Sequence, residues 1–370
     1  MSWENTVTGG RRLRRGRSSG SCAAAAAKAA VAMLFGGEKL GRVSIDTPAG
    51  VRLEVDLEEI ALGSGSAGCA VRKDSGDDPD ITNGMLIYAR AVPVSEPGVR
   101  IRTGQGVGVV TKPGLQVAVG KPAINPVPEK MILEEAASVL PPGKGVEVEI
   151  SIPDGERLAR KTLNARLGVT GGLSILGTSG LVEPMSEQSY KDTLALELKA
   201  VREEHRGPAV LVTGNYGREL ARDHFGLPEK AVVKIGNLVG FSLDRCLELE
   251  FKKVLLIGHA GKLIKVTAGI FNTHSRVADA RFEVFAARAA LLGAGSEQIR
   301  ELREMTTTED MVDLLAGLGD ENLFDRLAAD VSSRAGEYLF GQLALGTVLF
   351  NFRRGLLGLD EMAQKILEEF

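Results

Sequence analysis

The chain has 370 residues, of which 44% are hydrophobic and 25% are charged, and its formal net charge is −3. These values are typical of a soluble globular protein of two or three domains, with a core that needs no disulfide or metal to hold it together. A slightly acidic balance argues against nucleic acid as the main partner.

Cysteine content and hydropathy narrow the class further. Cys22, Cys69 and Cys246 are widely separated, so neither a disulfide framework nor a zinc site is expected. No uninterrupted apolar run approaches the length of a membrane span. We therefore expect a cytoplasmic protein with no metal site and no membrane partner.

The N-terminal stretch combines five arginines within residues 11–17 with an apolar segment, residues 23–35, that Lys28 interrupts. A signal or transit peptide has similar features, but Lys28 and the lack of a convincing cleavage site favour another interpretation. We expect a solvated basic tail followed by a helix, because alanine is the best helix former, with Ser21 as its N-cap.

The first half alternates strand and turn patterns in the manner of an α+β domain. The expected elements are a helix at residues 129–140 and strands at residues 42–46, 51–55, 69–72, 87–94, 99–102 and 146–152. Residues 104–108 form a GxGxG run, but the next residues predict a strand, so we reject a dinucleotide fingerprint. The proline-rich residues 122–128 are expected to be extended.

An acidic loop, residues 73–80, carries four carboxylates around a glycine and a proline: Asp74, Asp77, Asp78 and Asp80. Three interpretations stay open, namely binding of a divalent cation, contact with polar groups of a substrate, and simple turn chemistry. The spacing departs from the EF-hand pattern and lacks its closing glutamate, so composition alone favours a turn.

Three strand–turn–helix units follow one another in the second half. Their apolar strands are residues 209–213, 231–235 and 254–257, and each ends at a glycine turn. Such a succession predicts a parallel sheet with right-handed crossovers, whose turns lie at one carboxyl edge, where ligands bind. Residues 278–370 are expected to be largely helical and to wrap this sheet.

The expected fold class is an α+β N-terminal domain followed by an α/β domain with a parallel sheet and glycine-rich strand–helix turns. We place the first domain at residues 1–153 and the α/β ligand-binding domain at residues 154–300. A C-terminal helical segment, residues 301–370, is expected to pack on the second domain.

The turns after the parallel strands carry the chemistry. Tyr216, in the turn at 214–217, either stacks on an adenine or caps a helix. Residues 258–262 lack the spacing and the hydroxyl of a phosphate loop, and no GxSxG elbow is present, so ATPase and hydrolase chemistry have no support. His259 and His274 lack paired ligand spacing, which favours either a satisfied polar side chain or a substrate contact over a metal ligand. By themselves the residues indicate an α/β enzyme that uses an adenine-containing cofactor.

Six stretches, which run in order along most of the chain, carry a resemblance to a known family. They are RGRSSGSCAAA at 15–25, KDSGDDPDIT at 73–82, GKPAINPVP at 120–128, and residues 171–180, 214–217 and 258–276. Together they closely resemble the cobalt-precorrin-5B C1-methyltransferases, the CbiD family of anaerobic cobalamin biosynthesis. The chain departs from that pattern at Arg17, Ser18 and Ser19, where the family usually has an aromatic residue and two threonines, and at Asn83, where it commonly has histidine.

The resemblance implies transfer of a methyl group from S-adenosyl-L-methionine to C1 of cobalt-precorrin-5B, which gives cobalt-precorrin-6A. On this basis we expect the cofactor at Gly214, Asn215, Tyr216, Gly217, Gly258, His259 and Gly261. We expect the substrate at Ser19, Lys262, Asn272, Thr273, His274, Ser275 and Arg276. The candidate catalytic residues, which would orient the ring, accept a proton or bind the cofactor amino group, are Asp77, Asp78 and Asp80. Cobalt would belong to the substrate, so no protein metal site is expected.

Two alternatives would use the same glycine turns. One is a nicotinamide-dependent reductase that acts on a corrinoid, and the other is a non-catalytic carrier of a corrinoid intermediate. A reductase should show GxGxxG at a strand–helix junction with an acidic residue about 20 residues further on, which the sequence lacks. The sequence leaves a homo-oligomer open.

Overall fold

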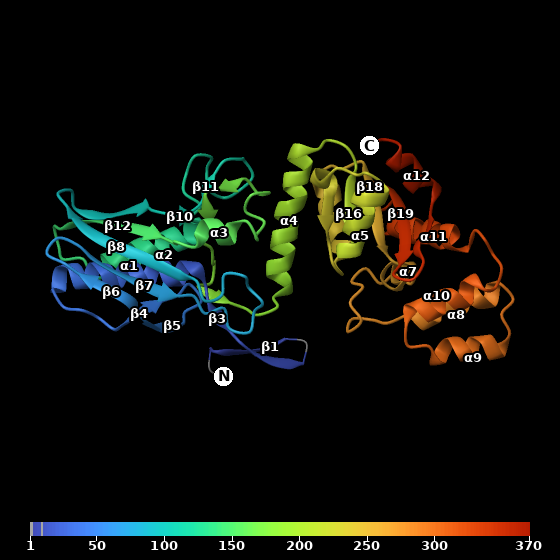
Figure 1. Ribbon diagram of the computed structural model, residues 1–370, viewed down its shortest axis with the longest axis horizontal. Coiled ribbons are helices and arrows are strands. Elements are labelled where there is room, and N and C mark those ends of the chain that lie inside the picture. The colour runs from blue at the N-terminus through green and yellow to red at the C-terminus, as the bar shows by residue number, and fades with distance from the viewer. Residues whose placement is uncertain (1–2, 9) are drawn as a thin grey trace. The chain divides into compact units, whose positions relative to one another are not determined.

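A computed structural model describes residues 3–8 and 10–370, which fall into two compact units, Met1–Glu187 and Gln188–Phe370 (Figure 1). The short strands at residues 169–173 pair with strands at residues 106–110, so this stretch belongs to the first unit. The division into domains at residues 153 and 300 stays a prediction.

The main sheet of the first unit is mixed. Its order is β6 (Glu58–Leu62), β7 (Ala67–Arg72), β8 (Leu86–Val94), β12 (Gly145–Ser151) and β9 (Gly98–Thr103). Neighbouring strands are antiparallel except β12 and β9, which run parallel. Alternate residues of β12 are buried, as expected for a sheet with one face on the core. The predicted strands in this region are confirmed, and β6 is an addition to them.

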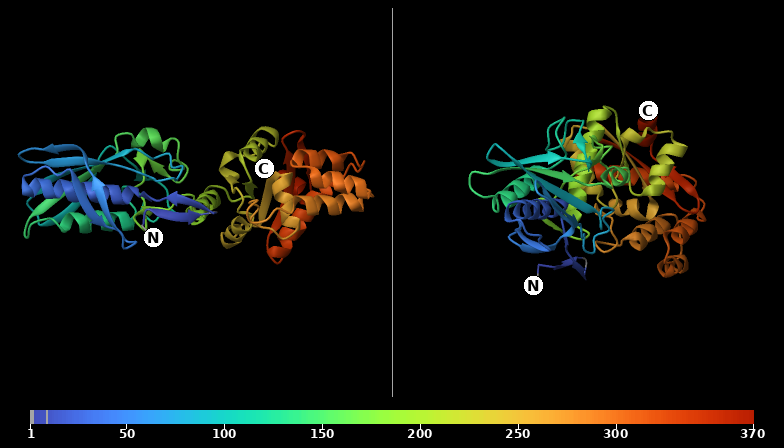
Figure 2. Two further views of the ribbon diagram at one scale, coloured as in Figure 1. Left: turned by 90° about the horizontal axis from the view of Figure 1, so that it is seen from below. Right: turned by 60° about the vertical axis from the view of Figure 1, so that its left-hand side comes forward.

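Helix α1 (Ser19–Gly36) is the centre of this core (Figure 2). All its alanines but Ala32 are fully buried, because small side chains let α1 lie close both to the sheet and to α2 (Pro126–Ala137). Length and composition would allow α1, alone among the described helices, to cross a membrane, although most of it is buried inside the unit. Ser18 caps the helix by accepting a hydrogen bond from the N–H of Ser21, so the prediction of Ser21 as N-cap was wrong.

The arginine-rich segment before α1 is exposed at Arg11, Arg12 and Arg14, as expected, but the part that the structure describes forms strands, so the expectation of a tail was wrong. Strands β1 (Asn5–Thr8) and β2 (Arg11–Arg14) form a hairpin, and β3 (Gly16–Arg17) pairs with β15 (Leu181–Val182). Arg14 pairs with Asp74, and Arg15 pairs with Glu183 at 2.6 Å, so carboxylates in the folded unit hold these cations.

Smaller elements complete the first unit. The strands predicted at residues 42–46 and 51–55 are confirmed, and they form a hairpin of β4 (Arg42–Asp46) and β5 (Arg52–Asp56). The GxGxG run leads from β10 (Gly106–Val107) into β11 (Val109–Val110), not into a helix, which confirms the rejection of a dinucleotide fingerprint. The extended conformation expected for residues 122–128 was wrong at its end, because α2 begins at Pro126, where proline suits the first helical turn. The remaining elements are α3 (Gly155–Ala159), β13 (Val169–Thr170) and β14 (Gly172–Leu173).

The second unit contains the predicted parallel sheet. Its order is β17 (Val232–Lys234), β16 (Ala209–Val212), β18 (Lys253–His259), β19 (Ala344–Asn351) and β20 (Gly355–Leu359). The first four strands are parallel and β20 is antiparallel. The expectation that residues 278–370 are largely helical was therefore wrong at β19 and β20. An apolar run as short as β19 cannot be assigned to strand or helix by periodicity.

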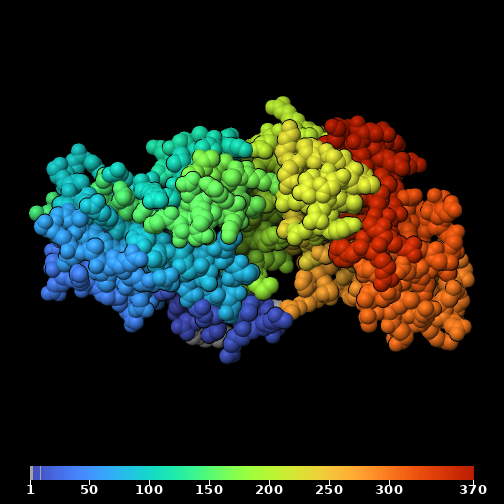
Figure 3. Space-filling model, viewed as in Figure 1, coloured from blue at the N-terminus to red at the C-terminus, as the bar shows by residue number. Residues whose placement is uncertain are grey.

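Helices cover both faces of this sheet, which explains why its strands read as continuous apolar runs. On one face lie α4 (Glu187–Glu204), α6 (Val239–Glu248), α7 (Ala260–Thr267) and α11 (Leu323–Tyr338). On the other lie α5 (Asn215–Glu219), which continues into a π-helical turn (Leu220–His224), a 3-10 turn (Glu229–Ala231) and α12 (Glu361–Leu367). Helices α8 (Arg281–Leu291), α9 (Ser296–Glu304) and α10 (Thr308–Ala316) form a small lobe beside them, drawn in orange in Figure 3.

Candidate functional site

The carboxyl ends of the parallel strands meet at one edge of the second unit's sheet. Strand β16 leads into Gly214, β17 leads into Asn237, and β18 ends at His259, the N-cap residue of α7. His259 is in register with Phe350 of β19, so this strand ends at the same edge. The edge therefore gathers side chains from four strands, as expected for a ligand site in an open parallel sheet.

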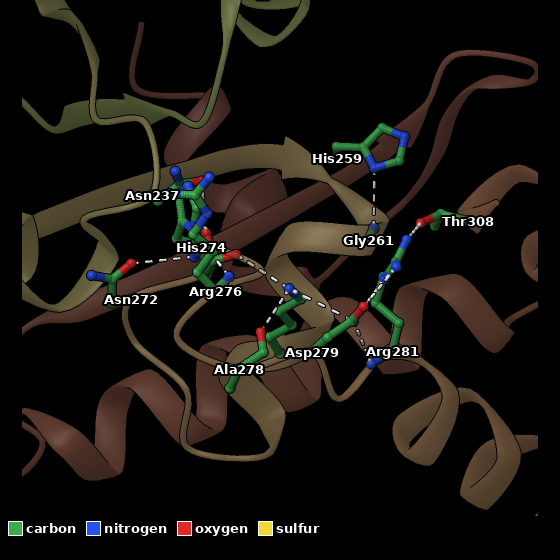
Figure 4. Close-up of polar contacts among 12 residues, drawn as sticks. Asn237, His259, Gly261, Asn272, His274, Arg276, Ala278, Asp279, Arg281 and Thr308 are labelled. Carbon is green, nitrogen blue, oxygen red and sulfur yellow. Dashed lines mark hydrogen bonds and ion pairs between the residues drawn. The ribbon is translucent and has the colours of Figure 1, made fainter. Parts of the chain in front are cut away.

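A pocket of about 450 Å³ opens at this edge. Its lining comes from the turn after β17, the start of α7, the polar segment after α7 and the first residues of α8 and α10: Asn237, His259, Gly261, Lys262, Lys265, Thr273, His274, Ser275, Arg281 and Thr308. Six of these residues were predicted from the sequence as cofactor or substrate contacts. Figure 4 shows several of them around the start of α7.

Both ring nitrogens of His259 have partners. Nδ1 accepts a hydrogen bond from the backbone N–H of Gly261 at 3.1 Å, and Nε2 lies 3.0 Å from Oε1 of Glu309. This pattern places the proton of the neutral ring on Nε2. Burial lowers the pKa of His259, although Glu309 opposes that shift, so the neutral form is favoured.

Lys262 carries a positive charge without a carboxylate beside it. Its Nζ donates to the backbone carbonyl of Thr213, at the end of β16, at 3.1 Å, and no acidic residue in the described part of the chain pairs with it. Burial, followed by repulsion from Lys265, lowers its pKa. An anionic ligand group would therefore find a partly desolvated cation ready to pair with it.

Lys265 and Arg281 of the lining form a charged cluster with Asp279. Nζ of the buried Lys265 donates to the carbonyls of Thr273 at 3.3 Å and Ala278 at 3.0 Å. Arg281 donates to both oxygens of Asp279 at 2.7 Å, which lowers the pKa of this carboxyl to about 2 (Figure 4). Asp279 thus holds Arg281 in place and stays ionised.

The polar segment after α7 is ordered by its own hydrogen bonds. The side chain of Asn272 accepts from the N–H of His274 at 3.2 Å, and Nδ1 of His274 accepts from the N–H of Arg276 at 3.1 Å. The buried Thr273 is tied by its N–H to the carbonyl of Asn237 at 3.0 Å. The pocket includes Thr273, His274 and Ser275, whereas Asn272 and Arg276 are outside its lining.

Sequence analysis missed four lining residues: Asn237, Lys265, Arg281 and Thr308. Asn237 follows a glycine in the second predicted turn, so its place at the carboxyl edge could have been inferred from that pattern. No comparable signal marked the other three, which lie inside α7 or begin α8 and α10.

The predicted glycines differ in what surrounds them. A Cβ at Gly217 would lie 3.3 Å from the ring of Phe350, one at Gly258 would lie 2.6 Å from the side chain of Leu263, and one at Gly261 would lie 2.3 Å from Oγ1 of Thr308. These three glycines allow close packing within the unit. At Gly214, by contrast, the backbone is extended and a Cβ would meet nothing within 4 Å, so this turn is open to a ligand.

Tyr216 belongs to an aromatic cluster rather than standing free. Its ring centroid lies 4.9 Å from that of Phe350 and 5.5 Å from that of Phe352, and the ring of His259 lies 4.7 Å from that of Phe352. Its neighbour Asn215 accepts a hydrogen bond from Nζ of Lys234 at 3.1 Å. The turn after β16 thus contacts β17 through Asn215 and Phe350 of β19 through Tyr216.

The predicted catalytic aspartates lie in the first unit, in the loop after β7, and all three accept hydrogen bonds there. Asp77 accepts from the N–H of Arg14 at 2.6 Å, and Asp78 accepts from the N–H of Met185 at 2.9 Å. Asp80 accepts from the N–H and hydroxyl of Thr82 and pairs with the buried Nζ of Lys73.

These bonds stabilise the loop. Burial would raise the pKa of Asp80, but the charge of Lys73 and the bonds to Thr82 lower it on balance. The loop is confirmed as a turn, and its pattern of bonds agrees with turn chemistry. Nowhere in the described ranges do three or more His, Cys, Asp or Glu residues gather as metal ligands would.

Ser19, the substrate residue predicted in the first unit, is also bonded locally. Its hydroxyl donates to the carbonyl of Leu176 at 3.1 Å and accepts from the N–H of the same residue at 2.8 Å. These bonds connect the start of α1 to the glycine-rich segment near residue 177. The hydroxyl of Ser19, which was predicted to contact the substrate, thus has a structural role.

Comparisons with known proteins agree on one family. The family model described as CbiD matches residues 6–184, and the model described as the CbiD C-terminal domain matches residues 272–361. The chain is 45% identical to cobalt-precorrin-5B C(1)-methyltransferase of Alkaliphilus metalliredigens, over 98% of this chain and 96% of that protein. It is 47% identical to the protein of the same name from a Thermoanaerobacter species, over 95% of this chain and 96% of that one.

One solved structure is also similar. It is the crystal structure of the cobalamin biosynthesis protein CbiD from Archaeoglobus fulgidus, with 31% sequence identity. The match covers 74% of this chain and 86% of that chain, with a TM-score of 0.39.

Proposed function

The chain belongs to the CbiD family of cobalt-precorrin-5B C(1)-methyltransferases, and from this premise we propose how its second unit divides the two ligands. The chain is a C-methyltransferase of cobalamin biosynthesis that uses S-adenosyl-L-methionine and acts on a corrinoid. Similarity over nearly the whole length of relatives with one name is the observation that carries this activity. Formation of cobalt-precorrin-6A as the product belongs to the proposal.

The substrate side of the proposal rests on the charge of the pocket. The pocket lining carries three cations, Lys262, Lys265 and Arg281, and two carboxylates, Asp279 and Glu309, are bonded to lining residues, so one positive charge is left over when the histidines are neutral. A corrinoid precursor of this kind carries acidic side chains around its ring, and such a cation can pair with them. Lys262 is the best placed, because it has no carboxylate partner in the described part of the chain.

The cofactor side rests on the turn after β16. Gly214 is the predicted cofactor glycine with open space where a side chain would be, and Asn215 next to it is exposed. We therefore assign the cofactor to Gly214 and Asn215, with His259 and Gly261 between the two ligands. The carbonyl of Thr213, which binds Lys262, links this turn to the pocket.

The bound cofactor supplies an electrophilic methyl group. The electron-rich macrocycle offers the carbon nucleophile, so the protein needs to orient the ring and exclude water more than it needs a strong base. In this proposal Lys262, Arg281 and the polar segment with His274 orient the ring through its acidic side chains. The catalytic roles expected for Asp77, Asp78 and Asp80 stay predictions, as do a cytoplasmic location and a homo-oligomer.

Anaerobic incubation with cobalt-precorrin-5B and S-adenosyl-L-methionine, followed by mass spectrometry, tests the activity. We expect the substrate to gain the mass of one methyl group and S-adenosylhomocysteine to appear. The control replaces S-adenosyl-L-methionine with NADPH, and no mass change is expected. A change with NADPH alone would favour a reductase, and unchanged substrate in both mixtures would favour a carrier.

A further inference from the structure

Phe352 is an exposed aromatic residue at the edge of the sheet where the pocket opens. It lies in the turn between β19 and β20, directly after Asn351, the last residue of β19. Its side chain is 64% exposed, whereas Phe350, two residues earlier, is 2% exposed. Single exposed apolar side chains are common on proteins, so exposure by itself gives Phe352 no function. The residues around Phe352, however, indicate a function for it.

The turn that carries Phe352 is held on both sides. Arg353 pairs with Asp310 at 3.0 Å and also with Asp313, and Arg354 donates to Asp313 at 2.5 Å. The side chain of Asn351 accepts a hydrogen bond from the N–H of Arg354 at 2.7 Å. The phenyl ring is thus presented by a fixed turn, so a ligand would not have to order the turn as it binds.

The same turn is connected to the pocket through Glu309. This carboxylate bonds with Nε2 of His259 and with the backbone of Phe352. The rings of His259 and Phe352 are in contact, with centroids 4.7 Å apart and planes inclined by 34°. The rings of Tyr216 and Phe352 meet edge to face, with their centroids 5.5 Å apart. Phe352 therefore continues, outside the pocket, a group of rings that begins at a lining residue.

The pocket by itself cannot enclose a tetrapyrrole. Its volume of about 450 Å³ lies at the lower end of the range for small-molecule sites, which suits a nucleoside-sized molecule or the acidic arms of a larger one. The surplus positive charge selects the second of these, because acidic arms pair with Lys262 whereas a sulfonium is repelled. With its arms in the pocket, the macrocycle would have to extend over the rim, where Phe352 lies beside His259.

We propose that Phe352 is a substrate-binding residue, against whose exposed ring the corrin-type macrocycle packs while its carboxylates reach Lys262 and Arg281. This inference rests on the proposed function, since it takes the pocket to be the site for acidic arms. The contact with Phe352 is apolar and involves the ring system itself, whereas the polar contacts of the pocket recognise only the acidic side chains at the edge of the macrocycle. Phe352 would then make the site selective for acids that carry a large flat ring.

The test compares Phe352→Ala with the full-length wild type. Binding is measured by titration calorimetry with two probes, cobyrinic acid as a corrinoid polycarboxylate and S-adenosylhomocysteine as the cofactor product. We expect Phe352→Ala to bind cobyrinic acid about tenfold more weakly, as for loss of one aromatic stacking partner, and S-adenosylhomocysteine unchanged. Phe352→Trp keeps a flat apolar ring and should restore the affinity for cobyrinic acid.

Phe340→Ala is the matched control, because Phe340 is an 88% exposed phenylalanine of the same unit that lies outside the ring cluster and the pocket lining. It should leave both affinities unchanged. Weaker binding of S-adenosylhomocysteine by Phe352→Ala would overturn the inference and give Phe352 to the cofactor. Unchanged binding of both probes would overturn it too. If the wild type itself fails to bind cobyrinic acid, the proposed substrate pocket fails, and this inference with it.

Discussion

Replacing Lys262 with methionine removes the unpaired charge of the pocket and nearly preserves the length and apolar part of the side chain. A hydrogen bond between a charged group and its partner contributes about 1.5–3 kcal/mol. Lys262 is only half-buried, so screening by water favours the lower end of this range, which corresponds to an affinity about tenfold weaker. Loss of the bond to the carbonyl of Thr213 should lower the free energy of unfolding by only about 1 kcal/mol.

The dependence on pH makes this prediction sharper. Burial lowers the pKa of Lys262 from its ordinary value of 10.5, so the free enzyme loses this charge at a lower pH than an exposed lysine would. Affinity for a carboxylate ligand should therefore fall as the pH rises through the lowered pKa, since the cation is present only below it. Lys262→Met should bind more weakly and lack this fall.

The assay is titration calorimetry with cobyrinic acid and with S-adenosylhomocysteine, repeated at several alkaline pH values. Lys252→Met, at an exposed lysine that precedes β18, is the control and should behave like the wild type. The assignment of the pocket is refuted if Lys262→Met binds cobyrinic acid as tightly as the wild type while it loses S-adenosylhomocysteine. Equal losses for both probes would also contradict it, because they would indicate a general structural effect.

Three further predictions concern other residues. Asp80→Asn leaves the buried amine of Lys73 without its carboxylate, so we expect the free energy of unfolding to fall by about 2–3 kcal/mol in urea titrations. An unchanged stability with a lower kcat would instead favour a catalytic role for Asp80. Gly214→Ala should unfold like the wild type within about 0.5 kcal/mol, because its Cβ meets open space, but should bind S-adenosylhomocysteine more weakly; unchanged affinity would remove Gly214 from the cofactor site. Burial lowers the pKa of His259 below 6.5, so as the pH falls the unfolded chain takes up this proton at a higher pH than the folded chain does. The contribution of His259 to stability is therefore present above pH 6.5 and is lost as the pH falls through the lowered pKa. His259→Asn keeps a side chain able to cap α7, so it should weaken the pH dependence of the free energy of unfolding, measured by urea titration, in that window. An unaltered pH profile would show that the pKa shift is absent.

Local patterns predicted the framework of the site well. Apolar runs that end at glycine turns placed β16, β17 and β18 side by side, and the polar residues after them do line a pocket. In the sequence, the carboxylates of the acidic loop were equally good candidates for a functional role. The partners of Asp77 and Asp78, the N–H groups of Arg14 and Met185, come from 63 and 107 residues away, so these structural bonds could not be read from local spacing.

The glycines show a second limit of local patterns. In the sequence Gly214, Gly217, Gly258 and Gly261 are alike, because each lies in or near a turn after a parallel strand. In the structure a Cβ at Gly261 would collide with Thr308, whereas one at Gly214 would meet nothing. Whether a glycine makes room for the protein or for a ligand depends on residues that fold against it from elsewhere in the chain.

The missed strand β19 had the largest consequence for the site. Its pairing with β18 puts Phe350 opposite His259, and any residue that follows β19 must then lie near the carboxyl edge. The position of Phe352 thus follows from the sheet register, although the sequence around it shows no glycine turn that leads into a helix. The same segment brings Arg353 to Asp310 of α10, whose neighbour Glu309 bonds with His259. The sequence therefore predicted three of the four strands that end at this edge. The missed strand, β19, leads into Phe352, the exposed residue that we propose to contact the macrocycle.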